Sequence, residues 1–356
     1  MRLVGCIIAE LGLASALLAG TGFAGARGLT RAQSWVASHR ARTETAAARH
    51  LSLRRRLDLS ADDAPMVALE SAGTFLGMSD ELLLERIRTQ AVTRLKLNRG
   101  GSSLSFRVDF ADGSRAAWKP AQTNAQTVPR KEVAAYRLNR LLGLDAVPPA
   151  APRSIPRDDL VALLHPDSAA ALPRIRAETI VGPSGLVEGE ASYWIPVIRD
   201  ADLDTPAGHQ QLGAWLSQGE PIPFERRSFV SQVSTLVVFD FLTANPDRYS
   251  GGNMKTSSDG SQLYYMDNTM SFFLDPQGTE KNRLALAKTQ RFSRRVYAAL
   301  PRIDEGTLRR LMHEPDGSEI LTAVEIHAVV QRRAFVQRHV AELVKEFGEA
   351  KVFCFP

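Results

Sequence analysis

The sequence predicts an α+β fold of two lobes, in which a small β-rich amino-terminal lobe precedes a mostly helical carboxy-terminal lobe. Three observations support this prediction. Strand-like alternation and a tight-turn signal lie between Leu104 and Lys119. Helical spacing of apolar residues dominates after residue 228. The chain has 356 residues, and single cores rarely grow past about 250–300 residues. We therefore expect one lobe over residues 96–205 and the other over residues 206–356.

The first 26 residues have the character of an export signal. Residues 11–26 carry no charge and end in the small-x-small pattern of Ala24-Gly25-Ala26, which suits signal peptidase. We therefore expect an exported protein, either periplasmic or secreted. Glu10 interrupts the apolar run and arginines follow it, so an uncleaved membrane anchor and a cytoplasmic protein stay open as alternatives.

The net charge of +5 is concentrated in one segment. Between Arg27 and Arg56 there are eight arginines and one acidic residue, Glu44, so the rest of the chain is slightly acidic. We interpret residues 27–95 as a basic linker followed by a helical extension over 57–95, in which Ser79 is an N-cap. No nucleic-acid-binding face is expected, and a membrane contact is expected only through an uncleaved amino-terminal segment.

A β-hairpin is predicted at the start of the first lobe. Apolar residues alternate from Leu104 to Phe110, and Asp112-Gly113 supplies a tight turn before a strand that ends at Lys119. A proline follows and leaves the ammonium group at the end of the strand. Gly100-Gly101, just before the hairpin, would let backbone amides approach phosphate oxygens, although such a pair is also common in plain turns.

A helix is predicted from Arg130 to Leu142, with Glu132 in its first turn. The helix dipole favours a carboxylate there in any case, but Glu132 could also pair with Lys119 and hold the ammonium against the phosphates of a nucleotide. Further strands are predicted over residues 159–164 and 192–198. The second contains Trp194 and Ile195 and could offer backbone hydrogen bonds to an adenine ring.

The second lobe is predicted to begin with a strongly apolar helix over residues 228–244. Pro246 then releases the chain into a glycine-rich loop that carries Asp247 and Asn253. Strands over 253–256 and 262–266 form a predicted hairpin, which would bring Asn253 and Asp267 to the same end. Helices over 304–313 and 318–347 complete the lobe.

The polar residues of this loop and hairpin have the chemistry needed to hold metal-bound phosphates beside a base. Asp247 would accept the proton of an acceptor hydroxyl or orient it, while Asn253 and Asp267 would offer a neutral and a charged oxygen to one metal ion. The alternative is that asparagine, aspartate, proline and glycine serve here only as turn residues.

Several motifs in a fixed order extend this interpretation to residues 99–273, and together they resemble the atypical kinases of the secretory pathway. This group comprises the Four-jointed-like Golgi kinases and their bacterial relatives, which are distant kin of phosphatidylinositol kinases and HipA. The motifs are Trp118-Lys119-Pro120, Glu132-Val133-Ala134-Ala135-Tyr136-Arg137-Leu138, Phe239-Asp240-Phe241-Leu242-Thr243-Ala244-Asn245-Pro246-Asp247-Arg248, Gly251-Gly252-Asn253 and Met266-Asp267-Asn268.

The resemblance implies a two-lobed kinase-like fold with ATP and Mg²⁺ or Mn²⁺ in the cleft. It assigns Lys119 and Glu132 to phosphate positioning, Asp247 to the catalytic base, and Asn253 and Asp267 to the metal. The implied reaction is phosphorylation of a hydroxyl on a protein serine or threonine, on a sugar or on another small acceptor. A nucleotide-binding pseudokinase or scaffold, and an AMP transferase on the same fold, stay open as alternatives.

The sequence departs from the family pattern at two places. Tyr249 stands where the family usually has histidine, and Asn253 follows Asp247 by six positions instead of the usual five. The disulfide cysteines of animal members are missing, since the chain contains only Cys6 and Cys354.

Overall fold

The computed structural model describes residues 73–203, 205–249 and 252–356. The predicted export signal and the basic segment lie outside the described residues. Every element named below belongs to one compact unit, Met66–Pro356.

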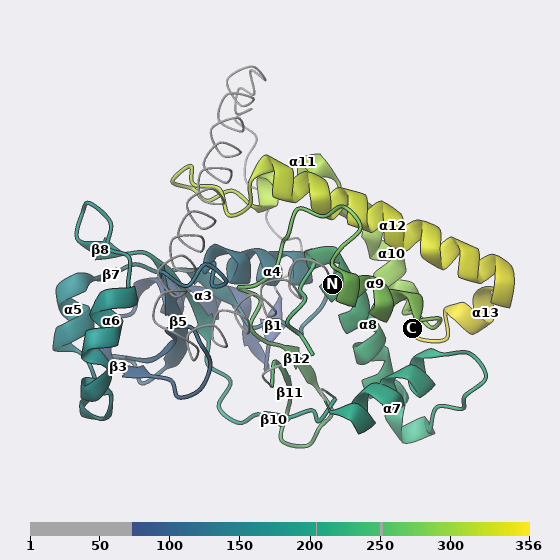
Figure 1. The fold of residues 1–356 in the computed structure, drawn as a ribbon, viewed down its shortest axis with the longest axis horizontal. Coiled ribbons are helices and arrows are strands. Elements are labelled where there is room, and N and C mark those ends of the chain that lie inside the picture. Colours follow the sequence, from purple (N-terminus) through teal and green to yellow (C-terminus); the bar gives the residue numbers. More distant parts are fainter. Residues whose placement is uncertain (1–72, 204, 250–251) are drawn as a thin grey trace, which may run out of the picture. The chain divides into compact units, whose positions relative to one another are not determined.

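A five-stranded antiparallel sheet is the centre of the amino-terminal lobe (Figure 1). The strands follow one another across the sheet in the order β3-β4-β5-β9-β6, and their bounds are β3 Val92–Leu97, β4 Phe106–Phe110, β5 Arg115–Pro120, β6 Ala150–Pro152 and β9 Gly189–Tyr193. The predicted hairpin is confirmed as β4 and β5. Its alternation buries Phe106, Val108 and Phe110 on one face, because successive side chains of a strand point to opposite faces.

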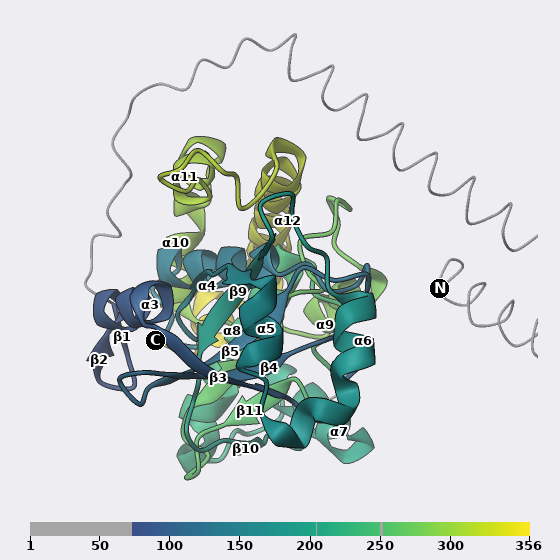
Figure 2. The same ribbon diagram turned by 90° about the vertical axis from the view of Figure 1, so that its left-hand side faces the viewer.

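Helices flank this sheet, and in the view of Figure 2 helices α5 and α6 lie in front of its strands. Their bounds are α3 Asp80–Thr89, α4 Arg130–Leu141, α5 Arg157–Ala162 and α6 Leu172–Glu178, with the 3₁₀ helix η1 Pro166–Ala171 before α6. The predicted cap of α3 is confirmed, since the side chain of Ser79 accepts a hydrogen bond from the backbone of Leu82.

Three predicted elements of this lobe are wrong in type or extent. Residues 92–95 belong to strand β3 and not to the preceding helix, because they pair with β4. Residues 159–164 lie mostly in helix α5, where Pro156 precedes two aspartates in the first turn, a composition that favours a helix start. The strand predicted over 192–198 ends at Tyr193, and Trp194 and Ile195 lie beyond its end.

The carboxy-terminal lobe is mostly helical. Helix α8, Arg227–Thr243, is buried along most of its length, as its apolar sequence predicts. The longest helix, α12, spans Ala323–Phe347 and begins with a capping box between Thr322 and Glu325. The other helices are α7 Pro206–Leu216, α9 Glu280–Ala287, α10 Arg294–Ala299, α11 Glu305–Leu311 and α13 Glu349–Val352, with the 3₁₀ helices η2 Phe224–Arg226 and η3 Leu300–Arg302.

The second predicted hairpin is confirmed as β11, Met254–Thr256, and β12, Leu263–Tyr265. Strand β10, Arg199–Asp200, extends it to a three-stranded sheet. Two further pairs of short strands are β1 Thr74–Phe75 with β2 Met78–Ser79, and β7 Ile155–Pro156 with β8 Leu186–Val187. The prediction of an α+β fold with a β-rich first lobe and a helical second lobe is therefore confirmed.

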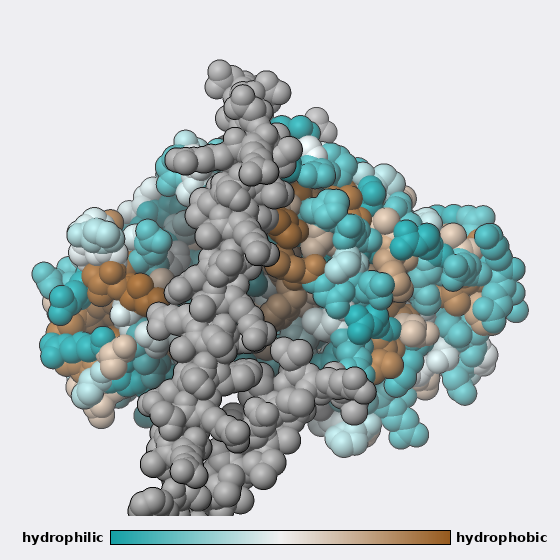
Figure 3. All heavy atoms as spheres, turned by 45° about the horizontal axis from the view of Figure 1, so that its top comes forward, coloured by the Kyte–Doolittle hydropathy of each residue, from teal (hydrophilic) through white to brown (hydrophobic). Residues whose placement is uncertain are grey.

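Two main apolar clusters form the core of the described residues, and the larger one includes residues of both lobes. Side chains of α4, α8 and α12 belong to the larger apolar cluster, and those of β4, β5 and the other strands of the five-stranded sheet form a smaller one. In the coloured part of Figure 3, most residues are hydrophilic and hydrophobic residues form separate patches. Among the described residues, no helix is long and apolar enough to cross a membrane.

Candidate active site

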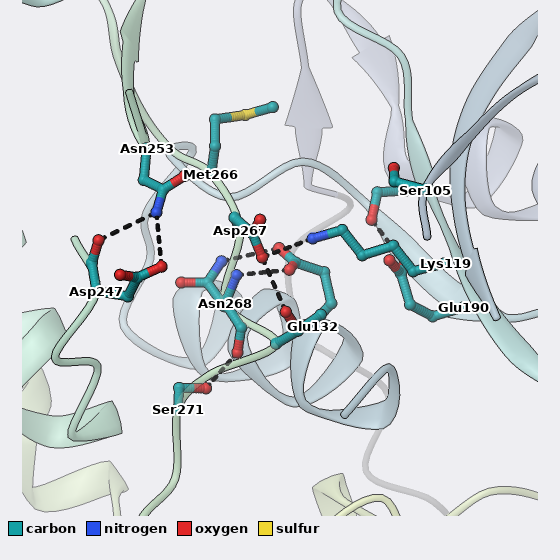
Figure 4. Close-up of polar contacts among 12 residues, drawn as sticks. Ser105, Lys119, Glu132, Glu190, Asp247, Asn253, Met266, Asp267, Asn268 and Ser271 are labelled. Atoms are coloured by element: carbon teal, nitrogen blue, oxygen red, sulfur yellow. Dashed lines mark hydrogen bonds and ion pairs between the residues drawn. The ribbon is translucent and has the colours of Figure 1, made fainter. Parts of the chain in front are cut away.

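The loop that follows α8 is stabilised by hydrogen bonds from its own polar side chains. Helix α8 ends where Ala244 takes a left-handed conformation, and Asn245 Oδ1 then accepts a hydrogen bond from the backbone of Asp247 at 2.9 Å. Asn253 Nδ2 donates to the carbonyl of Asp247 at 3.0 Å and to its carboxylate Oδ2 at 3.1 Å (Figure 4). The six-residue spacing therefore does not keep the two predicted site residues apart.

Arg248 is the brace of this loop. Its side chain is fully buried and forms an ion pair with Asp240 of α8, with Nε 3.1 Å from Oδ1 and 3.2 Å from Oδ2. Its Nη1 donates to the backbone carbonyls of Asn253 and Met266, and its Nη2 donates to Asn268 Oδ1 at 2.6 Å. One guanidinium group thus ties α8, the loop and the segment after β12 together.

Asp267 follows strand β12 in a left-handed backbone conformation, with φ 52°. A residue with a Cβ pays a conformational cost there, and such backbone strain is found disproportionately at functional sites. Asp267 Oδ1 accepts a hydrogen bond from Thr269 Oγ1 at 2.8 Å and lies 2.6 Å from Lys119 Nζ. Burial opposes ionisation, but Lys119 and the hydrogen bonds outweigh it and hold the pKa of Asp267 below its usual value. Asp267 is therefore ionised at neutral pH.

Lys119 reaches Asp267 from strand β5 of the other lobe, and Figure 4 shows the ammonium group pointing at the carboxylate. Burial alone would lower the pKa of the lysine. The carboxylates of Asp267, Glu132 and Glu190 outweigh burial and raise the pKa above its ordinary value. Lys119 therefore stays charged at neutral pH.

Glu132 lies in the first turn of α4, as predicted, but its hydrogen bonds go to Asn268. Oε2 accepts from the backbone nitrogen of Asn268 at 2.6 Å, and Oε1 accepts from its Nδ2 at 2.8 Å. The expected Lys119–Glu132 ion pair is thus replaced by the Lys119–Asp267 pair in this structure, because both oxygens of Glu132 are directed to Asn268. Glu132 still contributes to the raised pKa of Lys119.

Sequence reasoning missed Glu190. It lies in β9, directly opposite Lys119 in the β5–β9 pairing, and only 1% of its surface is exposed. The sequence offered one weak signal, a charged residue inside a strand-like run. Its alignment with Lys119 depends on a strand pairing that no local pattern predicts.

Four more residues were predicted to contact the nucleotide, Gly100 and Gly101 at its phosphates and Trp194 and Ile195 at its adenine ring. Gly100 and Gly101 lie in the exposed loop between β3 and β4, both with positive φ, and a side chain at either would enter open space. Ile195 packs in a small apolar cluster, and the backbone nitrogen of Trp194 donates to the carbonyl of Arg115. Contact of these four residues with a nucleotide stays a prediction.

Tyr249 occupies the position where the resembling family usually has histidine. Its ring packs against His209 of α7 in an edge-to-face contact with ring centroids 5.9 Å apart. Burial raises the pKa of the Tyr249 hydroxyl above its ordinary value. The tyrosine thus has a packing role beside the loop.

The oxygen donors of the site suit a hard divalent cation. Asp267 offers an ionised carboxylate, and the amide nitrogen of Asn253 is engaged with Asp247, which leaves the amide oxygen to face a ligand. Mg²⁺ and Mn²⁺ prefer such carboxylate and carbonyl oxygens. These two residues therefore have the ligand chemistry of the divalent metal site predicted from the sequence.

A separate cavity of about 580 Å³ is lined by residues 199–203, by α7, by the start of α8 and by the β11–β12 hairpin. Its lining contains Trp215 and Phe229 but none of the site residues described above. This cavity therefore does not coincide with the polar cluster around Lys119 and Asp267, where the charged groups converge.

The chain has a two-lobed kinase-like fold, and a lysine from one lobe faces an aspartate from the other. Solved structures share this fold. A crystal structure of the Golgi casein kinase is 16% identical, with a TM-score of 0.58 over 77% of this chain and 78% of that one. The same kinase with Mn/ADP bound gives 16% identity and a TM-score of 0.59 over the same shares.

The structure of hydra Fam20 with sugar is 21% identical, with a TM-score of 0.58 over 81% of this chain and 95% of that one. These similarities establish the fold. No protein-family model matches the chain, and no curated protein matches it significantly.

Proposed function

We propose that the protein is an ATP- and divalent-metal-dependent phosphotransferase that phosphorylates a hydroxyl group. The observation that carries this proposal is the contact of 2.6 Å between Lys119, on the sheet of one lobe, and Asp267, at the hairpin of the other. The residue that we propose as the phosphate-binding cation is thus next to the proposed metal ligand, with Asp247 on the adjacent loop. The Mn/ADP complex of the similar Golgi casein kinase structure supports the same use of the cleft.

Each residue has a separate part in the proposed reaction. Asp247 accepts the proton of the acceptor hydroxyl group while the oxygen of that hydroxyl group attacks the γ-phosphorus of ATP. The bond from the γ-phosphorus to the β–γ bridging oxygen then breaks, and ADP leaves. Lys119 balances charge on the phosphates. The metal would be held by Asp267 and Asn253 and would supply charge stabilisation of the phosphates. Glu132 holds Asn268 and so fixes the segment that carries Asp267.

The acceptor classes that we propose are a protein serine or threonine, a sugar, or another small molecule with a hydroxyl group. One similar structure is named as a casein kinase, which supports a protein acceptor. Another is named as a complex with sugar, which supports a sugar acceptor. Mass spectrometry of products formed from a cell extract and labelled ATP would distinguish phosphopeptides from phosphorylated sugars.

Purified protein incubated with α- or γ-labelled ATP in parallel tests the proposal. We expect label from the γ position to enter an acceptor or, slowly, to be released as phosphate. Retention of the α label by the acceptor would instead indicate AMP transfer. ATP binding without any turnover, with either Mg²⁺ or Mn²⁺, would indicate a pseudokinase.

A further inference from the structure

The cavity beside α7 has no part in the proposed reaction, and its volume of about 580 Å³ lies within the range of about 300–1,000 Å³ that is usual for ligand-binding sites. Thr256 and Gly260 of the β11–β12 hairpin line it. Asn253 and Asp267 flank the other end of the same two strands. The cavity and the proposed metal ligands therefore lie at opposite ends of one hairpin.

The walls of the cavity are held in place by hydrogen bonds of the fold. Ala201 donates from its backbone nitrogen to the carbonyl of Met254 at 3.1 Å and so joins one wall to the hairpin. The buried side chain of Arg291 donates to the carbonyl of Trp215 at 2.9 Å and to the carbonyl of Glu220 at 2.5 Å. The end of α7 and the loop after it are thus tied together, and the hollow is preformed.

Aromatic rings and unpaired charges share the lining. The rings of Trp215 and Phe229 are half-buried and pack edge to face, with centroids 6.3 Å apart. Aromatic anchors of this kind are typical of the centres of binding sites for other proteins. Three carboxylates and two guanidinium groups of the lining form no hydrogen bond or ion pair with any described residue: Asp202, Glu220, Glu225, Arg199 and Arg226. The unpaired charge of the lining is therefore slightly acidic.

Exposed apolar residues lie next to the cavity in the chain. Phe224 is 90% exposed and stands between Pro223 and Glu225, which both line the cavity. Val197 is 64% exposed and lies two residues before the lining residue Arg199. Single exposed apolar side chains are common, but several of them beside one hollow are typical of a protein-binding surface.

Strand β10 adds a feature that suits a peptide. It lines the cavity and is an edge strand of the three-stranded sheet. Because Ala201 bonds to β11 and successive residues alternate, the backbone N–H and C=O of Asp200 point away from β11. Neither group has a backbone partner among the described residues. An extended peptide can pair with such an edge, whereas a sugar has no matching backbone.

We propose that this cavity is a docking site for an extended peptide segment of a protein acceptor, which places an apolar side chain against Trp215 and a basic side chain beside Glu220 and Glu225. Three strand residues rise about 10 Å, so the docked segment lies roughly that far from the end of the hairpin that carries the metal ligands. A few extended residues span this distance. The link to an acceptor rests on the proposed function, because only a phosphotransferase requires one there.

Binding of synthetic peptides tests the site without any turnover. Each fluorescein-labelled probe has a glycine–serine frame with one leucine and two arginines, and the spacing between leucine and the arginines varies from one to four residues across the set. We expect at least one spacing to bind more tightly than the bare frame in fluorescence anisotropy. Glu225→Lys should weaken that binding about 10-fold, because it replaces an attracting charge with a repelling one. Phe224→Ser should weaken it several-fold, because an apolar contact at the rim is lost.

Glu342→Lys is the matched control for Glu225→Lys. Glu342 is exposed on α12, does not line the cavity and undergoes the same change of charge. It should bind the peptides like the wild type. All three substituted side chains are exposed, so the melting temperatures of the variants should equal that of the wild type and weaker binding would not reflect loss of folding.

A second assay connects the site to phosphoryl transfer. A peptide that carries an acceptor serine several residues from the leucine and arginines is compared with the same peptide without them. Docking raises the local concentration of the serine, so the KM of the docking peptide should be about 10-fold lower at a similar kcat. This difference should disappear in Glu225→Lys and persist in Glu342→Lys.

The outcomes separate this inference from the proposed function. Peptide binding that is weakened by Glu225→Lys and Phe224→Ser would support the docking site even if the protein transfers no phosphate. Transfer to serine peptides with no advantage from the leucine and arginines would support the proposed function and overturn the docking site. Equal binding of every peptide and the bare frame would overturn it as well. Saturable binding of cellotetraose that is lost in Glu225→Lys, without peptide binding, would assign the cavity to a sugar instead.

Discussion

Arg248→Met should be among the most destabilising single substitutions in the chain. It removes a fully buried guanidinium group that pairs with Asp240 and donates to Asn253, Met266 and Asn268. Removing one partner of a buried ion pair costs about 3–5 kcal/mol. This is a large part of the roughly 5–15 kcal/mol by which proteins are stable. At about 2 °C per kcal/mol for a large domain, the melting temperature should fall by roughly 6–10 °C.

The loss should also depend on pH. Burial raises the pKa of Asp240 to about 6, and Arg248 opposes that rise, so the substitution should raise the pKa further. A carboxyl group whose pKa is higher in the folded than in the unfolded state contributes stability below its unfolded pKa. That stability is lost as pH rises through the folded pKa. The difference in unfolding free energy between wild type and Arg248→Met should therefore be larger at pH 8 than at pH 5.

Urea denaturation followed by circular dichroism at both pH values measures this difference. Arg309→Met is the matched control, because Arg309 forms an exposed pair with Glu305 within one helix, and such a pair contributes only about 0.3–0.5 kcal/mol. A cost below about 1 kcal/mol for Arg248→Met, or an equal cost at pH 5 and pH 8, would refute the bracing role.

The other predictions concern the proposed reaction. Asp247→Asn should bind nucleotide like the wild type but transfer phosphate about 10²–10⁴-fold more slowly, because the substitution removes the base. Calorimetry measures nucleotide binding, and a labelled-phosphate assay measures transfer. Asp267→Asn should weaken Mn²⁺-dependent nucleotide binding at least about 10-fold, because a charged metal ligand is lost. Equal Mn²⁺ titrations in variant and wild type would contradict the assignment of Asp267 as a metal ligand. Chelation with EDTA should stop transfer by the wild type, and added Mg²⁺ or Mn²⁺ should restore it; transfer that persists in EDTA would rule out the metal requirement.

The sequence predicts those parts of the site that depend on local pattern and chain order. The alternation before Asp112-Gly113 and the turn itself predict the β4–β5 hairpin, and hence Lys119 at the end of a strand. The second hairpin likewise predicts that Asn253 and Asp267 lie at one end of β11 and β12. These patterns are reliable because turn residues and period-two burial act over a few residues.

Features that depend on distant partners are not predictable in this way. The short apolar run after Pro156 suits either a buried strand or a helix, and the structure makes it helix α5. The alignment of Glu190 with Lys119 comes from pairing between strands about 70 residues apart in the sequence. The direction of Glu132 towards Asn268 depends on how two lobes meet, which no local spacing encodes.

The central claim is that Asp247, Lys119 and Asp267 form a phosphoryl-transfer site. Its most direct test is transfer of γ-labelled phosphate from ATP by the purified protein and by Asp247→Asn, at equal nucleotide occupancy and with Mn²⁺ present. We expect transfer by the wild type and a loss of at least about 100-fold in the variant. Equal transfer by the two proteins, or none by a wild type that is saturated with ATP, would contradict the claim.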